Sequence, residues 1–347
     1  MTERVERLRE RLDAPLLVTD LTNVFYLTGF ESSNAALVVH PGTREPQLFT
    51  DFRYIEAAQE VPGVEVVQTK RALVRDLADR LTGRLAFEAD ALPYSQVETL
   101  RGGGLELTPT TGVVEGLRAV KDDEELAKLR RAAKVAERAF EALTAETWVG
   151  QTEKDVAWRL RQLMHAHGAD DLSFDTAIAA GPNGSLPHAD PTDRVIATHT
   201  LVVADFGARL EGYCSDCTRT LATGDLPREL RRMYDVCLEA QEACVAQIRA
   251  GMTGVEADAI AREIITRAGF GDNFGHGLGH GVGLKVHEAP RLATESTDTL
   301  DAGNVVTIEP GIYLPGVGGV RIEDLAVVTE DGVELLTSFP KELITVG

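Results

Sequence analysis

The chain has 347 residues, of which 44% are hydrophobic and 26% are charged, a composition typical of a globular protein with one large domain or two smaller ones. Its net charge of −20 opposes binding to nucleic acids and to anionic membrane surfaces, so neither is an expected partner. No stretch approaches the roughly 20 apolar residues of a membrane span, and the first residues alternate in charge. We therefore expect a soluble, cytoplasmic protein.

The first part of the chain alternates short apolar runs with amphipathic stretches. The apolar runs include 14–18, 36–39 and 64–67, and helical periodicity covers 3–12 and 71–82. This alternation predicts a small α/β domain.

A long charged amphipathic stretch at 121–146 follows, with Asp122 and Asp123 as candidate N-caps. We place a domain boundary just before it and expect domains at 1–120 and 121–347. The second domain alternates helical patterns with glycine-punctuated, β-branched segments, and this predicts an α+β domain with antiparallel hairpins. The helical patterns cover 152–167, 227–249 and 254–268, and the β segments cover 174–180, 195–206, 212–221, 304–309 and 320–328.

Two predicted hairpins carry pairs of acidic residues. The segment 201–219 reads as strand, turn and strand, and a turn at Leu210 and Glu211 would set Asp205 opposite Asp216. The segment 305–324 contains a second hairpin, and a turn centred on Gly316 would set Glu309 opposite Glu323.

Four clustered carboxylates repel one another unless cations lie between them or their pKa values rise. The alternative, acids on the solvated faces of two hairpins, is the more common one for a single pair. A second pair in the same half of the chain, also in an apolar context, favours a metal site.

The segment 274–288 adds His276, His280 and His287 in a glycine-rich frame. One imidazole with four carboxylates suits Mn(II), Co(II) or Zn(II), and four acidic charges balance two divalent ions.

These motifs, in this order and spacing, resemble those of the pita-bread metallopeptidases, in particular Xaa-Pro dipeptidase (prolidase) and aminopeptidase P. The similarity covers nearly the whole chain, because 23–30 and 48–54 resemble the N-terminal domain of that group. The resemblance implies a C-terminal pita-bread domain preceded by the smaller α/β domain. The motifs that carry it are Asp205-Phe206-Gly207, Ser215-Asp216-Cys217-Thr218-Arg219, His276-Gly277-Leu278-Gly279-His280, Val286-His287-Glu288, Glu309-Pro310-Gly311 and Arg321-Ile322-Glu323-Asp324.

The resemblance also implies the roles of individual residues. The five metal ligands fall on Asp205, Asp216, His280, Glu309 and Glu323, with Asp205 on one metal ion, His280 and Glu309 on the other, and Asp216 and Glu323 bridging both. The implied cofactors are two divalent ions, Mn(II) or Co(II) first and Zn(II) as an alternative. Glu309 would act as the general base, and His188 and His287 would stabilise the oxyanion and position the substrate.

Further residues are predicted around the ligands. Arg219 and Arg321 lie beside acids and are candidates for orienting them. His276, Arg291 and Arg321 are predicted to contact substrate, with Arg291 as a candidate clamp for the carboxylate of the proline. Cys214 and Cys217 are assigned to packing and not to the site, and the cysteines are expected to be reduced thiols.

The implied activity is hydrolysis of the Xaa-Pro bond in short proline-containing peptides by a homodimer. Xaa-Pro dipeptidase is the first interpretation, because the compact chain resembles short microbial prolidases, and aminopeptidase P is the second. Methionine aminopeptidase usually lacks the preceding domain, and creatinase lacks the metal ligands. A non-catalytic pita-bread module that binds peptides is the alternative from a different class.

Overall fold

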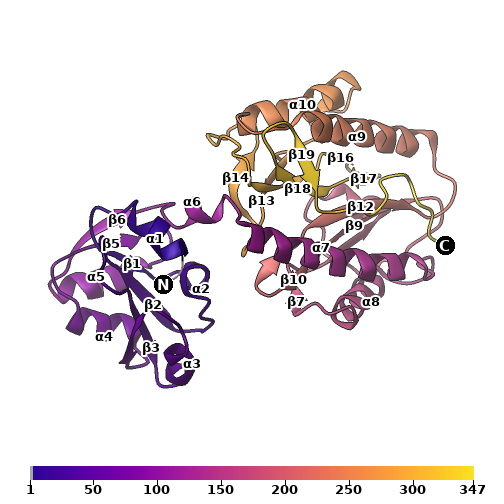
Figure 1. The fold of residues 1–347 in the computed structure, drawn as a ribbon. Coiled ribbons are helices and arrows are strands. Elements are labelled where there is room, and N and C mark those ends of the chain that lie inside the picture. Colours follow the sequence, from indigo (N-terminus) through magenta and orange to yellow (C-terminus); the bar gives the residue numbers. More distant parts are fainter. Residues whose placement is uncertain (1–2) are drawn as a thin grey trace. The chain divides into compact units, whose positions relative to one another are not determined.

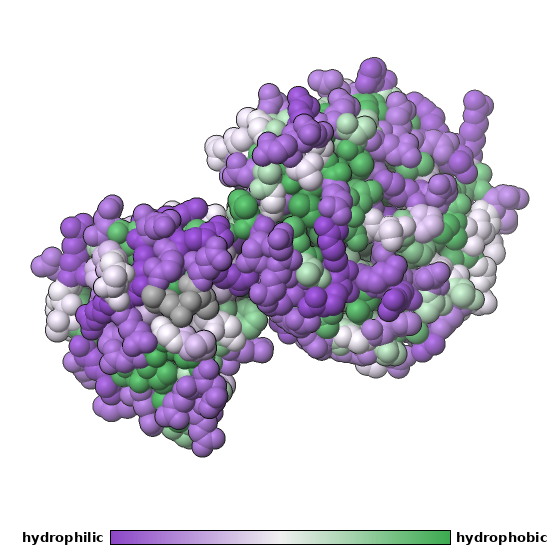
Figure 2. All heavy atoms as spheres, viewed as in Figure 1, coloured by the Kyte–Doolittle hydropathy of each residue, from purple (hydrophilic) through white to green (hydrophobic). Residues whose placement is uncertain are grey.

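The computed structural model describes residues 3–347 and divides the chain into two compact units, Met1–Arg118 and Ala119–Gly347. This division lies close to the domain boundary expected from the sequence. Figure 1 shows the fold, and Figure 2 shows hydrophilic side chains over most of the visible face of each unit. Among the described residues, no helix is both long and apolar enough to cross a membrane.

The first unit is built on one mixed sheet with strand order β4-β3-β2-β1-β5-β6. The central strands β1, β2 and β3 pair antiparallel, whereas β4, β5 and β6 are added by parallel pairing. Its buried core includes Leu17, Val38, Phe49 and Phe87 from the sheet. The elements are α1 (Glu3–Arg9), β1 (Leu16–Val18), α2 (Leu21–Thr28), β2 (Ala35–Val39), β3 (Gln47–Asp51), α3 (Ile55–Gln59), β4 (Glu65–Thr69), α4 (Leu73–Arg80), β5 (Arg84–Glu88), α5 (Tyr94–Gly102), β6 (Glu106–Thr110) and α6 (Glu115–Arg118).

The second unit places strands between two pairs of helices (Figure 1). Its elements are α7 (Asp123–Thr144), α8 (Glu153–Ala166), β7 (Asp171–Leu172), β8 (Ala177–Ala180), the 3-10 helix η1 (Gly181–Ser185), β9 (Leu201–Phe206), β10 (Ala208–Leu210), β11 (Tyr213–Cys214), β12 (Cys217–Ala222), α9 (Arg228–Gln247), α10 (Gly254–Arg267), the 3-10 helix η2 (Gly271–Asn273), β13 (Gly279–Gly281), β14 (Glu288–Leu292), β15 (Val305–Ile308), β16 (Gly311–Leu314), β17 (Gly318–Arg321), β18 (Asp324–Val328) and β19 (Val333–Leu335).

Two apolar clusters hold these layers together. One cluster packs α7 and α8 against the sheet β12-β9-β8, with Phe140 stacked on Phe206 at a ring distance of 4.2 Å. The other packs α9 and α10 against the strands β15 to β18. Each cluster buries one face of the strands, so the polar side chains of the opposite faces are directed toward the space between them.

The helices expected in both units are confirmed, with ends that differ by a few residues. The amphipathic stretch at 121–146 forms α7, and its N-terminus is fixed by a capping box in which Asp122 and Glu125 each accept a backbone hydrogen bond. The expected β segments form strands that are shorter and more interrupted than predicted. The segment 195–206 becomes a strand only from Leu201, and 212–221 and 320–328 are each split in two.

Candidate metal centre

A cavity of about 390 Å³ opens in the second unit, and all of the predicted ligand, catalytic and substrate-binding residues line it. They comprise the acids Asp205, Asp216, Glu309 and Glu323, the histidines His188, His276, His280 and His287, and the arginines Arg291 and Arg321. They come from segments spread over more than 130 positions of the chain, and the sheets of the unit bring them to one place.

Three of the four acids lie where a strand is interrupted. Asp216 lies between β11 and β12, Glu309 between β15 and β16, and Glu323 between β17 and β18. A break in the ladder frees the backbone from regular pleating, so a side chain can turn away from the sheet normal. Asp205 differs, because it lies inside β9.

The first hairpin has a different turn from the one predicted. Its turn residues are Glu211 and Gly212, with φ of 50° and 83°, as a type I′ turn requires. The register therefore sets Asp205 opposite Thr218, and the predicted pairing of Asp205 with Asp216 is wrong. Asp216 lies two positions before Thr218, and its carboxylate points toward that of Asp205. The two aspartates meet diagonally across the ladder.

The second hairpin has the predicted register. Gly311 pairs with Arg321 on one side of the break and Ile308 pairs with Asp324 on the other, so Glu309 and Glu323 occupy matching positions in the gap. Glu309 donates its backbone N–H to the Leu278 carbonyl, and Glu323 donates its own to the Thr218 carbonyl. Each glutamate is thereby held by a neighbouring segment rather than by its hairpin partner.

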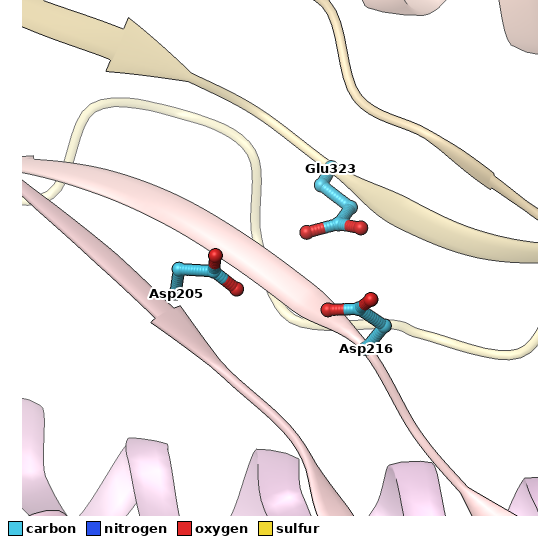
Figure 3. Close-up of side chains that lie close together, drawn as sticks. All are labelled: Asp205, Asp216 and Glu323. Carbon is cyan, nitrogen blue, oxygen red and sulfur yellow. The ribbon is translucent and has the colours of Figure 1, made fainter. Parts of the chain in front are cut away.

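Asp205, Asp216 and Glu323 direct their carboxylates toward one another (Figure 3). One oxygen of each lies within 4.8 Å of the other two. Burial raises the pKa of all three carboxyl groups, and the negative charges of their neighbours raise it further. The effect on the pKa is largest for Asp216 and Glu323, whereas the Arg321 guanidinium partly offsets it at Asp205.

His280 and Glu309 form the other side of the cluster. His280 Nε2 lies 3.3 Å from Glu309 Oε1 and 3.7 Å from Asp216 Oδ2. His280 Nδ1 lies 3.1 Å from the Gly281 carbonyl, which can only accept, so Nδ1 carries the proton and Nε2 faces the acids. Burial lowers the pKa of His280, but Glu309 outweighs this and raises it. Burial raises the pKa of Glu309, but His280 outweighs this and lowers it to about 2.

These residues fit a site for divalent cations. Asp205 Oδ1 is buried and has no hydrogen-bond partner among residues 3–347. An unpaired buried carboxylate oxygen is costly, and three acids converge at the same point, so a cation would relieve both penalties. Four carboxylates and one imidazole nitrogen are the ligand types that Mn(II), Co(II) and Zn(II) accept.

Arg321 lies beside the acids, and all three nitrogens of its guanidinium donate hydrogen bonds. Nη2 donates to Asp205 at 2.6 Å, Nε to the Thr218 hydroxyl at 2.9 Å, and Nη1 to the Tyr313 hydroxyl at 2.9 Å. Nη1 also donates to the Pro187 carbonyl at 3.0 Å. Arg219 binds the backbone carbonyls of Thr218 and Glu323 and the side chain of Asp324. The position of Arg321 favours an orienting role, and its contact with substrate stays a prediction.

Three residues that the sequence analysis did not single out bind the candidate ligands or their partners. Thr218 donates its hydroxyl to Glu323 Oε2 at 2.7 Å, and Thr307 donates to Glu309 Oε1 at 3.0 Å. Each threonine is two positions from a predicted ligand, and the period-two rule of strands could have identified it. Tyr313 links Arg321 to His276, and no sequence signal indicates that contact.

The remaining predicted residues lie around the cluster. The ring of His287 is 4.3 Å from that of His280, and burial together with the charge of His280 lowers the pKa of His287. His276 donates from Nδ1 to the Gly277 carbonyl and accepts from the Tyr313 hydroxyl at Nε2, and burial lowers its pKa. His188 is exposed at the cavity, and Arg291 lies opposite His280 in the β13–β14 ladder.

The cysteines are free thiols, as predicted, and neither Cys214 nor Cys217 lines the cavity. Cys217 packs in the core with Phe206 and Phe140. Burial raises the pKa of Cys214 to about 11 and that of Cys217 still further, so both remain protonated near neutral pH.

The chain is similar to known proteins over its whole length. Residues 127–330 match metallopeptidase family M24, and residues 4–120 match the creatinase/prolidase N-terminal domain. The chain is 37% identical to an Xaa-Pro dipeptidase of Pyrococcus furiosus, with 99% of this chain and 100% of that one covered. A solved Xaa-Pro dipeptidase from Bacillus anthracis is 41% identical, with a TM-score of 0.95 and 99% of both chains covered.

A solved X-Pro aminopeptidase from Thermotoga maritima is 34% identical, with a TM-score of 0.90 and coverage of 99% of this chain and 100% of that one. These similarities confirm the predicted fold class, an α+β pita-bread domain preceded by a smaller α/β domain. The match to the catalytic domain, the match to the N-terminal domain and the similarity to relatives over their full length all indicate the same family. The chain belongs to metallopeptidase family M24.

Proposed function

We propose that this enzyme is an Xaa-Pro dipeptidase, which hydrolyses the bond between an N-terminal residue and proline in a dipeptide. The observation that carries the proposal is the convergence of the carboxylates of Asp205, Asp216 and Glu323 with the His280–Glu309 pair in one cavity. The full-length similarity to an Xaa-Pro dipeptidase from Bacillus anthracis supports the choice of substrate.

Two divalent metal ions are part of this proposal. Asp205 would hold one ion and His280 with Glu309 the other, and Asp216 and Glu323 would be shared. The shared role of Asp216 is supported by its place in the carboxylate cluster and its distance of 3.7 Å from His280 Nε2. Bound divalent ions supply Lewis acidity, which polarises a peptide carbonyl and makes water reactive near neutral pH. Mn(II) or Co(II) is the proposed metal, with Zn(II) as an alternative.

The side chains would then move protons and bind the developing charge. Glu309, whose pKa is lowered to about 2, is ionised and can accept a proton from the attacking water. It would deliver that proton to the proline nitrogen, which must leave as an amine when the C–N bond breaks. His287 is neutral near pH 7 because its pKa is lowered, and with His188 it can donate an N–H to the oxyanion.

The preference for dipeptides is supported by the position of Arg291. Residues directly opposite in an antiparallel ladder share a face, so Arg291 projects on the same side as His280 and lines the cavity. Its side chain is exposed and makes no hydrogen bond or ion pair with residues 3–347. A guanidinium so placed is suited to bind the carboxylate of a C-terminal proline.

Aminopeptidase P is the second candidate, because the X-Pro aminopeptidase from Thermotoga maritima is also similar over its full length. A non-catalytic peptide-binding module would need no complete set of metal ligands, and the full set favours an enzyme. The homodimer and the cytoplasmic location expected from the sequence stay predictions.

The test compares hydrolysis of Ala-Pro with that of Ala-Pro-Ala by purified enzyme, first after chelation and then after addition of Mn(II), Co(II) or Zn(II). A dipeptidase should cleave Ala-Pro faster, lose activity on chelation and regain it with metal. Faster cleavage of the tripeptide would favour aminopeptidase P. Full activity in a verified metal-free preparation would contradict the metal centre, and metal binding without hydrolysis would favour the binding module.

A further inference from the structure

Glu153 is the first residue of α8 and is fully buried, yet no part of the proposed chemistry uses it. Its carboxylate accepts four hydrogen bonds. Oε1 accepts from the Ala180 N–H at 2.7 Å, and Oε2 accepts from the Asn183 side chain at 2.8 Å. Oε2 also accepts from the N–H of Thr192 at 2.9 Å and from its hydroxyl at 2.6 Å.

These donors lie at the two ends of one segment, residues 181–191, which begins with η1 and which we call the His188 loop. Ala180 ends β8 directly before the loop, and Thr192 directly follows it. Asn183, near the start of the loop, also donates to the Asp190 carbonyl near its end at 3.1 Å. Glu153 therefore joins the start and the end of the loop at a single buried carboxylate.

The middle of the loop is attached to the metal centre instead. Arg321 Nη1 donates to the Pro187 carbonyl at 3.0 Å, while Nη2 of the same guanidinium binds Asp205. His188 directly follows Pro187 and lines the cavity. The loop is thus fastened at its base by Glu153 and at its tip by Arg321, and His188 lies next to the tip.

We propose that Glu153 is a positioning residue for the reaction, because it closes the base of the His188 loop and so fixes His188 over the cavity. The proposal rests on the proposed function, which gives His188 a role in hydrolysis. Glutamine has the same shape as glutamate but replaces one acceptor oxygen by a donor NH₂ group. All four partners of Glu153 are donors, so Glu153→Gln sets donor against donor at the base of the loop.

The test compares Glu153→Gln with Asp155→Asn, a matched control in the same helical turn. Asp155 is exposed, and among residues 3–347 its carboxylate accepts hydrogen bonds only from Thr152. We expect Glu153→Gln to lower kcat/KM for Ala-Pro by about 10- to 100-fold, since small displacements of a catalytic group have effects of this size. Mn(II) affinity should be unchanged, and Asp155→Asn should behave like the wild type.

A double-mutant cycle with His188→Ala separates positioning from general damage. If Glu153 acts through His188, the Glu153→Gln, His188→Ala double variant should be no slower than His188→Ala alone. Hydrogen exchange should be faster at residues 184–190 in Glu153→Gln and unchanged in Asp155→Asn. If Glu153→Gln does not fold, Asn183→Ala removes one of the same contacts from an accessible position and should lower kcat/KM in the same direction.

The proposal would be overturned if the losses of the two single variants multiplied in the double variant. Weaker Mn(II) binding by Glu153→Gln would also overturn it, as would a wild-type kcat/KM in both Glu153→Gln and Asn183→Ala. The result that contradicts the proposed function is different. A folded wild-type enzyme that binds Mn(II) but cleaves no Xaa-Pro bond would refute the activity, while hydrogen exchange would still report whether Glu153 anchors the loop.

Discussion

Arg321 and Asp205 form a largely buried ion pair, with guanidinium Nη2 at 2.6 Å from carboxylate Oδ2. The guanidinium is itself fixed by Thr218 and Tyr313, so it holds Asp205 in one orientation. The other oxygen of Asp205 is left without a hydrogen-bond partner among the described residues, and the carboxylate faces Asp216 and Glu323. The ion pair thus holds one oxygen of the acid and leaves the other available to a cation.

Arg321→Lys should therefore weaken metal binding without unfolding the enzyme. Lysine keeps the positive charge but cannot make the separate contacts of the planar guanidinium. Loss of a partner that orients a ligand typically weakens metal affinity by about 10- to 100-fold, and we expect that loss in a Mn(II) titration. Arg209→Lys is the control, because Arg209 pairs with Asp171 at the surface. Equal affinities in Arg321→Lys and wild type would show that other contacts orient Asp205.

Metal affinity should rise with pH. The raised pKa values of His280, Asp216 and Glu323 mean that protons occupy part of the metal-free site. A cation must displace these protons, so binding releases them and becomes tighter as pH increases from about 5 to about 8. Calorimetry in buffers of different ionisation enthalpy measures the number of protons released.

The stability of the metal-free fold should fall as pH rises, whereas metal affinity increases. Asp216 and Glu323 have pKa values above those of unfolded acids, so their contribution to stability is lost as pH rises through the raised pKa and repulsion grows. The increase in Tm on addition of Mn(II) should therefore be larger at high pH than at low pH. An increase that does not depend on pH would contradict the protonated site.

Glu309→Gln should keep the fold and lose most of the turnover. The amide retains an oxygen for a metal ion but cannot accept and release a proton, and loss of a general base costs about 100-fold or more. The lowered pKa of Glu309 means that the wild-type residue is ionised over the working range of pH. Glu330→Gln, which changes a partly exposed glutamate between β18 and β19, serves as the control. A near-native kcat in Glu309→Gln would assign the proton transfer to another residue.

Local patterns in the sequence predicted part of this site correctly. The register of the second hairpin follows from its turn at Pro315 to Gly318, where glycines permit a tight reversal. The first hairpin could not be predicted as well, because its turn begins with Glu211 at positive φ, a conformation that side chains other than glycine and asparagine rarely adopt. The one-residue shift of the turn moved the partner of Asp205 by two positions.

Contacts between distant segments could not be predicted from spacing. Tyr313 reaches His276 from β16, and Glu153 reaches the His188 loop from the start of α8. Such contacts depend on how the layers pack, and a strand or helix pattern records only which face of an element is apolar. The resemblance to a family supplied candidate ligands, and the sequence already offered Arg321 as a residue that orients them. The contacts of Tyr313 and Glu153 became visible only in the fold.

The choice between dipeptides and longer peptides depends on Arg291. It lies opposite His280 in the β13–β14 ladder, lines the cavity and has no side-chain partner among residues 3–347. A dipeptidase must bind the carboxylate of the proline, whereas an aminopeptidase must leave that direction open for further residues. Arg291→Ala should raise KM for Ala-Pro by roughly 30-fold, which corresponds to about 2 kcal/mol for a charged hydrogen bond. KM for Ala-Pro-Ala should change little, because its carboxylate lies one residue farther away.

The control for this prediction is Arg267→Ala, which removes an exposed arginine from the end of α10. It should leave both KM values unchanged, so that a selective effect of Arg291→Ala cannot be assigned to the loss of positive charge from an enzyme of net charge −20. Equal increases in KM for the two peptides would exclude a carboxylate clamp at Arg291. A selective increase for the dipeptide would place the carboxylate of the proline beside β14, one cross-strand pair away from the histidine of the metal centre.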